Sequence, residues 1–339
     1  MRVIGLDIGG ANIKASDGEA VSVSVPFPLW QNRVGLREAL RDLLNRFNKP
    51  ERIAAAMTGE LADCFLTKRD GVAQIIDSLV TAAGHVPVQI WQTGGEFVDH
   101  ETACELTPLV AAANWHALAT WAGRMAPGKT ALLVDVGSTT CDIIPIENGI
   151  PMPAGRTDPE RLISGELVYT GVSRTPLCAV TDTLPYRGQH VPLAAEVFAT
   201  MLDAYLLLGR IPEGPESRET ANNQPATIDG AHDRMARMIC ADRHEVTLDE
   251  VREMAQAAAD QQSARIGTAL DRVLRNLPDR CRLVLTSGEG EFLAQDLTAA
   301  SSHLDGATTI SLAKALGPTH SRAACAFALA RLGRERILQ

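Results

Sequence analysis

Asp7-Ile8-Gly9-Gly10-Ala11-Asn12 and Asp135-Val136-Gly137-Ser138-Thr139-Thr140 are the two stretches of the chain that decide its fold. Each lies between two short runs of β-forming residues, so each is predicted to be a turn that joins two strands. Aligning Asp7 with Asp135 also aligns Gly9 with Gly137 and Asn12 with Thr140. The chain is therefore predicted to contain one strand–turn–strand unit twice.

The residue types in both turns suit a phosphate group. Glycines at positions 9, 10 and 137 let backbone N–H groups approach an anion without a Cβ in the way. Asp7 and Asp135 are candidate ligands of Mg²⁺, a hard ion that keeps most of its waters. The candidate contacts to phosphate oxygens are Asn12, Lys14, Ser138 and Thr139. For the first turn alone, the alternative is an ordinary hairpin with a surface aspartate.

A third glycine-rich turn, Thr286-Ser287-Gly288-Glu289-Gly290-Glu291, lies between a predicted strand and a predicted helix. The N-terminus of a helix favours anions, because its first N–H groups have no partner within the helix. Ser287, Gly288 and Glu289 are therefore candidate contacts for a nucleotide. Alone this motif is weak, but it gains meaning from following the other two turns.

The composition limits the kind of protein this can be. A chain of 339 residues with 45% hydrophobic and 22% charged residues predicts about two soluble globular domains. The formal net charge of -9 argues against duplex nucleic acid as a partner. No apolar run reaches the roughly 18 residues of a membrane span. Seven cysteines without a C-x-x-C pair indicate a reduced, cytoplasmic protein with neither a disulfide framework nor a structural zinc site.

The remaining segments predict an α/β protein. A three-stranded antiparallel meander is expected over residues 2–25, and a capping box at Thr247 and Glu250 opens a helix to about residue 276. An Ala-rich helix is expected over 109–123, and an inserted mixed segment, with helices near 193–208 and 231–240, over 156–246. The other expected elements are helices at 35–47, 71–83 and 318–332 and strands at 52–57, 88–91, 130–136, 141–146, 282–286 and 307–310.

The three turns in this order resemble the actin-like ATPase superfamily, which includes actin, sugar kinases and heat-shock ATPases. The resemblance implies two ribonuclease-H-like α/β domains with a central cleft, in which the first two turns bind phosphates and metal and the third binds the nucleoside side. We accordingly expect an N-terminal domain over 1–125 and a C-terminal domain over 126–339, with the insertion at about 156–246.

Further stretches resemble the hydantoinase/oxoprolinase-like branch, and within it a group of tetrahydromethanopterin-linked one-carbon-transfer proteins. They are Gly5–Asn12, Met57-Thr58-Gly59-Glu60-Leu61 with Asp63, Ala113-Asn114-Trp115, Ser164–Gly171 with Arg174-Thr175-Pro176, and Ser287–Glu291. The group includes the methanofuran-biosynthesis synthase, which joins an aminomethylfuran-methyl diphosphate to the phenol of γ-glutamyltyramine and releases pyrophosphate. The resemblance thus implies a Mg²⁺-dependent transferase that acts on a small phosphorylated substrate. The hydantoinase and oxoprolinase subunits are considerably longer than this chain.

Under this hypothesis the catalytic residues are Asp7, Glu60 and Asp135. Glu60 is the candidate base for the phenol proton, with Glu96 in reserve, and the alternative for Glu60 is a solvated loop carboxylate. Thr58, Asn114 and Arg174 are further candidate substrate contacts, and Arg156 and Arg161 are candidates for the same anions as Arg174. Each arginine is individually more typical of a surface ion pair.

Two rival hypotheses remain at this point. The first is an ATP-dependent enzyme, either a small-molecule kinase or a hydrolase of the hydantoinase and oxoprolinase type, with a nucleoside pocket near Ser287. The second is a non-enzymatic switch that closes on a nucleotide. The sequence leaves open whether the chain forms a homo-oligomer.

Overall fold

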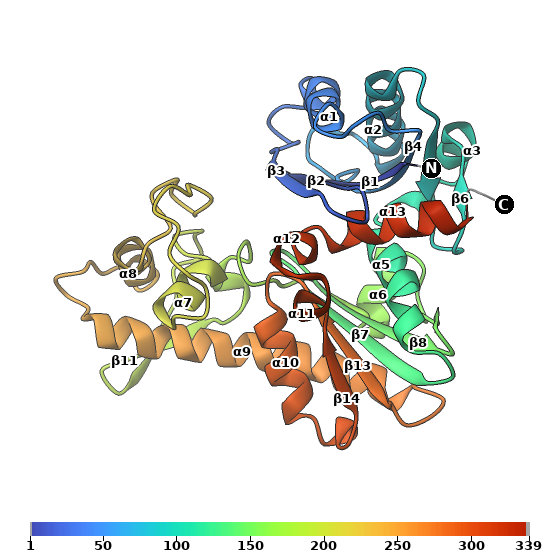
Figure 1. The fold of residues 1–339 in the computed structure, drawn as a ribbon. Helices are drawn as coiled ribbons and strands as arrows, with labels where there is room; N and C mark the ends of the chain where they lie inside the picture. The colour runs from blue at the N-terminus through green and yellow to red at the C-terminus, as the bar shows by residue number, and fades with distance from the viewer. Residues whose placement is uncertain (1, 337–339) are drawn as a thin grey trace.

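A computed structural model describes residues 2–336 and contains two α/β halves (Figure 1). The first half holds a six-stranded sheet in the order β3-β2-β1-β4-β5-β6. The first three strands are antiparallel neighbours, whereas β4 and β5 continue the sheet parallel to β1. The strands are β1 (Val3–Gly9), β2 (Asn12–Ser16), β3 (Ser22–Pro26), β4 (Arg52–Thr58), β5 (Val88–Trp91) and β6 (Phe97–Val98).

The second half repeats this arrangement with the order β10-β8-β7-β13-β14. Strands β7 and β8 form the antiparallel hairpin, and β13 and β14 extend the sheet parallel to β7. The strands are β7 (Thr130–Val136), β8 (Cys141–Glu147), β9 (Ile150–Pro151), β10 (Leu167–Val168), β13 (Leu283–Ser287) and β14 (Thr308–Ser311). The repeat predicted from the two turns is therefore confirmed as two sheets with the same strand order.

Helices fill three layers around these sheets (Figure 1). One apolar core joins the first sheet to α1 (Leu36–Leu44), α2 (Lys68–Ala83) and α3 (His100–Glu105). A second core lies between the two sheets and contains α5 (Asn114–Ala122) and α13 (Ala324–Arg336). A third covers the far face of the second sheet with α9 (Leu248–Arg275) and α10 (Glu291–Ala300).

The C-terminal helix α13 packs directly on the first strand. A Cβ on Gly5 would lie 1.9 Å from the backbone oxygen of Ala326, so only glycine permits this approach. Val3 belongs to the same inter-sheet core, and side chains alternate across a strand, so Val3, Gly5 and Asp7 share the face that looks toward the second half. The division into domains at 1–125 and 126–339 stays a prediction. In the structure α13, from the second range, packs on the sheet of the first.

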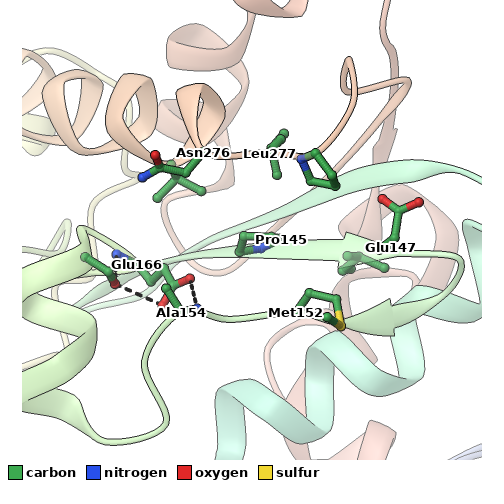
Figure 2. Close-up of a pocket in the computed structure, with 11 residues that line it drawn as sticks. Pro145, Glu147, Met152, Ala154, Glu166, Asn276 and Leu277 are labelled. Atoms are coloured by element: carbon green, nitrogen blue, oxygen red, sulfur yellow. Dashed lines mark hydrogen bonds between the residues drawn. The ribbon is translucent and has the colours of Figure 1, made fainter.

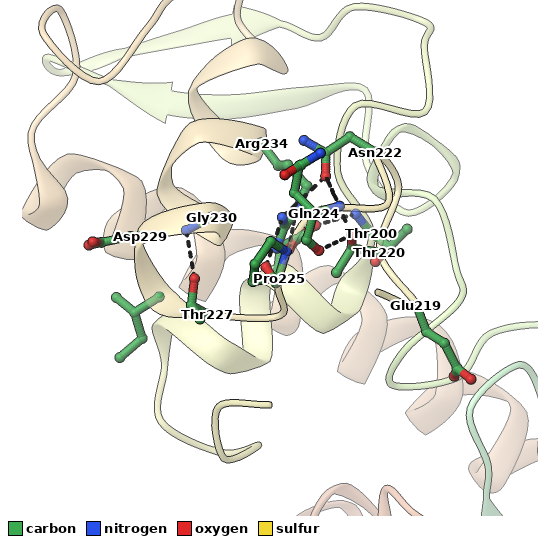
Figure 3. Close-up of polar contacts among 12 residues, drawn as sticks. Thr200, Glu219, Thr220, Asn222, Gln224, Pro225, Thr227, Asp229, Gly230 and Arg234 are labelled. Atoms are coloured by element: carbon green, nitrogen blue, oxygen red, sulfur yellow. Dashed lines mark hydrogen bonds and ion pairs between the residues drawn. The ribbon is translucent and has the colours of Figure 1, made fainter. Parts of the chain in front are cut away.

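A lobe formed by the inserted segment packs against α9. It contains β11 (Thr183–Tyr186), β12 (Gln189–Pro192), α7 (Met201–Leu207) and α8 (Ile228–Arg237). Arg234, which is fully buried, donates from Nε to Asp203 at 2.8 Å and from Nη1 to Asn222 and to the carbonyl of Pro225, both at 3.3 Å (Figure 3). These bonds fasten the loop before α8 to the lobe. At the start of the predicted insertion, α6 (Asp158–Ser164) leads into β10, which pairs with β8 at the edge of the second sheet. The bounds 156–246 stay a prediction.

Three helix predictions were wrong in their extent. The Ala-rich segment 109–123 is broken between α4 (Thr107–Val110) and α5, where Ala112 has a φ of 50°. The C-terminal segment is broken between α12 (Pro318–Ser321) and α13, and the helix expected at 193–208 is confined to α7. The remaining elements are α11 (Leu312–Leu316) and the 3-10 turns η1 (Gly123–Met125), η2 (Leu177–Ala179) and η3 (Ser302–Leu304). Within residues 2–336, none of the helices is long and apolar enough to cross a membrane.

Candidate active site

The two D-x-G turns are hairpin tips whose aspartates face each other's half. Asp7 on β1 lies opposite Lys14 on β2, and Asp135 on β7 lies opposite Asp142 on β8. Directly opposed residues in an antiparallel pair point to the same face of the sheet. Asp135 lies on the face of Leu133, which belongs to the inter-sheet core, just as Asp7 lies on the face of Val3. Strand alternation therefore aims all four polar side chains into the space between the halves.

A cavity of about 630 Å³ occupies that space. It brings together most of the residues that the sequence nominated as site residues. Those that line it are Asp7, Gly9, Gly10, Asn12, Lys14, Thr58, Glu60, Asn114, Asp135, Gly137, Ser138, Thr139 and Arg174.

Asp135 lies in an environment that favours its protonated form. Burial raises the pKa of its carboxyl to about 7, and the negative charges of Asp142 and Asp7 act in the same direction. Ser287, its neighbour on β13, and the ammonium of Lys14 oppose this shift in the pKa. Near neutral pH Asp135 is thus poised between its two protonation states, which is typical of a group that changes its charge when a ligand binds.

Lys14 supplies positive charge at the floor of the cavity. Burial disfavours its ammonium, but the carboxylates of Asp7, Glu289 and Asp135 outweigh burial and raise the pKa of Lys14. Burial also raises the pKa of Asp7, against the opposing effects of Lys14 and Asn114. Lys14 is therefore a charged side chain held among acidic groups that line the same cavity or lie close to it.

Glu60 lies two residues after the end of β4 and is only 1% exposed, so it is not a solvated loop carboxylate. Helix α2 covers it closely, since a Cβ on Gly71 would lie 2.1 Å from the backbone oxygen of Glu60. Burial raises the pKa of Glu60 to about 7, and its Oε2 has no hydrogen-bond partner within residues 2–336. The reserve candidate Glu96 is exposed and lies outside the cavity lining.

Arg161 is a buried cation of the second half and not the surface residue that its sequence context suggested. It is 1% exposed, and its Nη2 donates to Asp142 at 2.6 Å and to the Glu166 carbonyl at 3.1 Å. Its guanidinium lies 3.9 Å from the centre of the Trp115 ring, a cation–π distance. The Glu166 carboxylate in turn accepts from the backbone N–H of Ala154 at 2.6 Å beside the small pocket drawn in Figure 2.

Asp142 was missed by the sequence analysis, although a signal existed. Extending the alignment of the two hairpins by two residues, from Asn12 and Thr140, places Asp142 where the first hairpin has Lys14. Trp30, which also lines the cavity, has no such signal, because it lies in an irregular segment outside the repeat.

The mouth of the cavity is formed by exposed side chains of both halves. The guanidinium of Arg174, from the second half, lies 5.0 Å from the centre of the Trp30 ring, from the first half. Leu61 and Tyr169, which are 62% and 66% exposed, also line the cavity. Exposed aromatic and apolar side chains beside an arginine suit a ligand that has both an aromatic ring and a negative group.

The third turn lies behind the second rather than in the cavity wall. Ser287, Gly288 and Glu289 are absent from the lining, as far as the described residues show. A Cβ on Gly288 would lie 2.1 Å from the backbone oxygen of Val136, and the Gly290 N–H donates to that same oxygen at 2.8 Å. Glu289 is exposed, 3.5 Å from the Ser173 hydroxyl. A nucleotide contact at this turn stays a prediction.

The residues between the halves are of the type that binds Mg²⁺. Asp7 Oδ1 is buried and has no hydrogen-bond partner among the described residues, so it is available as a ligand. Within residues 2–336 no group of three or more His, Cys, Asp or Glu side chains is arranged to hold a metal. The site thus fits an ion that takes one or two carboxylates and completes its shell with waters and substrate phosphates.

Comparison with known proteins places this chain in a family. Residues 51–336 match the hydantoinase/oxoprolinase model. The chain is 33% identical over 341 aligned residues to the (4-{4-[2-(gamma-L-glutamylamino)ethyl]phenoxymethyl}furan-2-yl)methanamine synthase of Methanocaldococcus jannaschii, covering 99% of this chain and 98% of that protein. The synthase of the same name from Methanococcus vannielii is 36% identical over 122 residues, which are 36% of this chain and 54% of that protein.

The fold has counterparts among solved structures. Nucleotide-free acetone carboxylase superposes with a TM-score of 0.52 at 12% identity, over 94% of this chain and 51% of that one. The predicted architecture of two α/β halves is thereby confirmed. The match over residues 51–336 and the full-length likeness to the archaeal synthase lead to one conclusion: the chain belongs to the hydantoinase/oxoprolinase family.

Proposed function

We propose that the chain is a transferase of methanofuran biosynthesis, within tetrahydromethanopterin-linked one-carbon metabolism. It couples an aminomethylfuran-methyl diphosphate to the phenol of γ-glutamyltyramine and releases pyrophosphate. The observation that carries the proposal is the cavity between the hairpin tips, with phosphate-type donors at its floor and aromatic side chains at its mouth. The full-length likeness to a synthase whose printed name describes a phenoxymethylfuran product supports the same reaction.

The diphosphate would bind between the two tips. Lys14 offers a partly buried ammonium, Ser138 and Thr139 offer hydroxyls, and the glycine turns offer backbone N–H groups. Such donors are in place before the reaction and stabilise the charge that grows on the leaving diphosphate. Asp7 and Asp135 would hold Mg²⁺, which when bound neutralises part of the charge on the leaving group.

The reaction then exchanges one C–O bond for another. The bond between the furfuryl carbon and the diphosphate oxygen breaks, and the electron pair leaves with the diphosphate. The furan oxygen delocalises the positive character that remains on the carbon. The phenol oxygen forms the new ether bond, and Glu60, whose raised pKa suits proton transfer near neutral pH, accepts the phenol proton.

The mouth would hold the acceptor. Trp30 and Tyr169 are placed to contact the aromatic ring of the tyramine, and Arg174 to pair with the glutamyl carboxylate. In this arrangement the phenol points inward toward Glu60, and the flexible glutamyl chain lies near solvent.

The test is to incubate the purified protein with Mg²⁺, the furanmethyl diphosphate and γ-glutamyltyramine, and to measure pyrophosphate and the aryl ether by mass spectrometry. We expect pyrophosphate release that depends on the phenol. A parallel incubation with Mg²⁺ and ATP covers the rival hypotheses. ADP formation without use of the diphosphate would favour the ATP-dependent enzyme. Nucleotide-dependent shape change without turnover would favour the switch.

A further inference from the structure

A second cavity, of about 420 Å³, lies on the other side of α5 and shares none of its lining residues with the active-site cavity. Its walls come from both halves. The first half contributes the turn Thr93–Gly95 after β5, and the second half contributes the segment 149–153 and Arg156. The rest of the lining consists of His116 and Thr120 from α5, Arg124 from the turn that follows it, and Arg336 from the end of α13.

The polar lining of this cavity is rich in donors. Three of its residues are arginines, at positions 124, 156 and 336, and no Asp or Glu is among the lining residues that the structure describes. Arg124 pairs with Glu335, outside the lining, and Arg336 donates to the Gly95 carbonyl. The guanidinium of Arg156 makes no ion pair within residues 2–336. All three arginines are exposed, and Arg156 and Arg336 have no carboxylate partner among the described residues. An anion in the cavity would lie close to both of these positive charges and be attracted to them.

His116 adds a fixed donor. The indole Nε1–H of Trp91 donates to His116 Nδ1 at 3.2 Å, and an indole nitrogen cannot accept in return. The neutral imidazole therefore carries its proton on Nε2. Burial, together with the charges of Arg336, Arg156 and Arg161, lowers the pKa of His116 to about 4, so the neutral form prevails at physiological pH.

Thr93 provides an independent indication of a missing partner. It is 3% exposed, lines the cavity, and has a buried hydroxyl oxygen without a hydrogen-bond partner among the described residues. A buried hydroxyl left unpaired costs free energy, so such groups are rare in folded proteins. The oxygen is itself buried and does not face the open space of the cavity. A rotation of the Thr93 side chain about χ1 would let the hydroxyl donate to an oxyanion bound there.

We propose that this second cavity is a binding site for a small oxyanion with at least two negative charges, a phosphate or a polycarboxylate. The guanidinium of Arg156 and the hydroxyl of Thr93 hold it from opposite halves, with Arg336 and the Nε2–H of His116 between them. Guanidinium groups pair with the planar oxygens of carboxylates and with phosphates alike, so the shared chemistry defines the class. An anion held this way links the two halves at a place remote from the substrate.

The indole N–H of Trp91 makes a direct probe of this cavity, because it bonds to the His116 ring in the wall. In ¹⁵N-labelled full-length protein the four tryptophans give four indole signals, and the spectrum of Trp91→Phe identifies the relevant one. We expect the Trp91 signal to shift saturably when inorganic phosphate or, in a separate titration, citrate is added at constant ionic strength. The titration that saturates at the lower concentration identifies the class of ligand.

Variants separate this site from the active site. Arg156→Gln should raise the dissociation constant by about tenfold or more, since it removes a charged hydrogen-bond donor. Arg46→Gln, which removes an exposed arginine elsewhere, should leave the constant unchanged. Lys14→Met, in the active-site cavity, should leave the Trp91 response intact. A Trp91 signal that saturates with neither anion, or equal binding by wild type and Arg156→Gln, would overturn the proposal.

Thr93→Val tests the unpaired hydroxyl with nearly the same side-chain shape. We expect it to weaken anion binding while the melting temperature of the anion-free protein stays the same or rises, because no hydrogen bond is lost. A lower melting temperature together with unchanged anion affinity would show that the hydroxyl has a structural partner, and would count against the site. Anion affinity and melting temperature are both measured without catalytic turnover. Their outcome is therefore independent of whether the proposed transferase activity is found.

Discussion

The two hairpins that face each other across the cavity share a topology but differ in charge. In the first, Asp7 lies opposite Lys14, so the acid and its counter-charge come from one hairpin. In the second, Asp135 lies opposite Asp142, and the compensating cation, Arg161, comes from α6. The first hairpin therefore offers a cation to a ligand, whereas the second offers a concentration of negative charge. A duplicated scaffold has thus produced two unequal halves of one site.

The same contrast recurs where the fourth strand of each half ends. Thr58-Gly59-Glu60 begins at the last residue of β4, and Ser287-Gly288-Glu289 begins at the last residue of β13, the equivalent strand. Glu60 is buried beneath α2 and lines the cavity, but Glu289 is exposed beside the start of α10. Both strand ends have a hydroxyl residue, a glycine and a glutamate in this order. The packing of the helix that follows decides whether the glutamate side chain is buried or exposed to solvent. This difference suits Glu60, and not Glu289, for accepting a proton near neutral pH.

The strongest way to break the contrast between the hairpins is Lys14→Met. It removes the cation of the first hairpin and leaves both tips acidic, so we expect kcat/KM for the diphosphate to fall by roughly 10³-fold. The assay is phenol-dependent pyrophosphate release, with circular dichroism to verify folding. Lys129→Met, the same change at an exposed position, is the control. Equal activity of the two variants would contradict the role given to Lys14.

The contrast between the two strand ends is tested by Glu60→Gln. An amide of the same size cannot accept the phenol proton, so we expect kcat to fall by roughly 10²- to 10³-fold. Glu289→Gln, at the exposed counterpart, should lower kcat at least about tenfold less than Glu60→Gln does. If both variants lose activity to the same degree, the base lies elsewhere.

Glu60 also makes a prediction about stability and pH. Its folded-state pKa of about 7 lies above the ordinary 4.5, so between these values the folded state retains a proton that the unfolded chain has released. The free energy of unfolding should therefore fall as the pH rises through this window, by roughly 3 kcal/mol from this residue. Urea unfolding from pH 4 to pH 8 should show a shallower fall for Glu60→Gln. An identical pH dependence in both proteins would contradict the buried ionisation.

The smallest effect concerns the acid pair of the second hairpin. Asp142→Asn removes the main like charge beside Asp135, so the pKa of Asp135 in the protein free of ligand and metal should fall below about 7. Carboxyl ¹³C titration measures it, and Asp279→Asn, an exposed acid far along the chain, is the control. If Asp142→Asn leaves the pKa of Asp135 where it was, burial alone sets that pKa.

Sequence patterns predicted those parts of the molecule that depend on local chemistry. The repeated D-x-G turns placed Asp7 and Asp135 at hairpin tips, and strand alternation then directed them to one face. The capping box at Thr247 and Glu250 predicted the start of α9, and the structure confirms it. These features follow from backbone geometry and short-range hydrogen bonds, which depend on residues that are neighbours in the sequence.

Features set by tertiary packing escaped prediction. Ala112 adopts a positive φ, a conformation that alanine disfavours. The local sequence therefore did not predict that the helix breaks there and that α5 begins at Asn114. Arg161 looked like a surface arginine, because its partner Asp142 is 19 residues away in sequence. The burial of Glu60 depends on Gly71 in the next helix. Each case needed knowledge of which elements pack together.

The contact between Gly5 and Ala326 has a consequence for folding. Strand β1 receives the cover on one of its faces from α13, a helix that lies far away in the sequence. A chain that lacks residues 324–336 would leave Val3 and part of the neighbouring apolar face of β4 without this cover. Exposed apolar surface of this kind promotes aggregation, so the first sheet depends on a long-range contact to remain soluble.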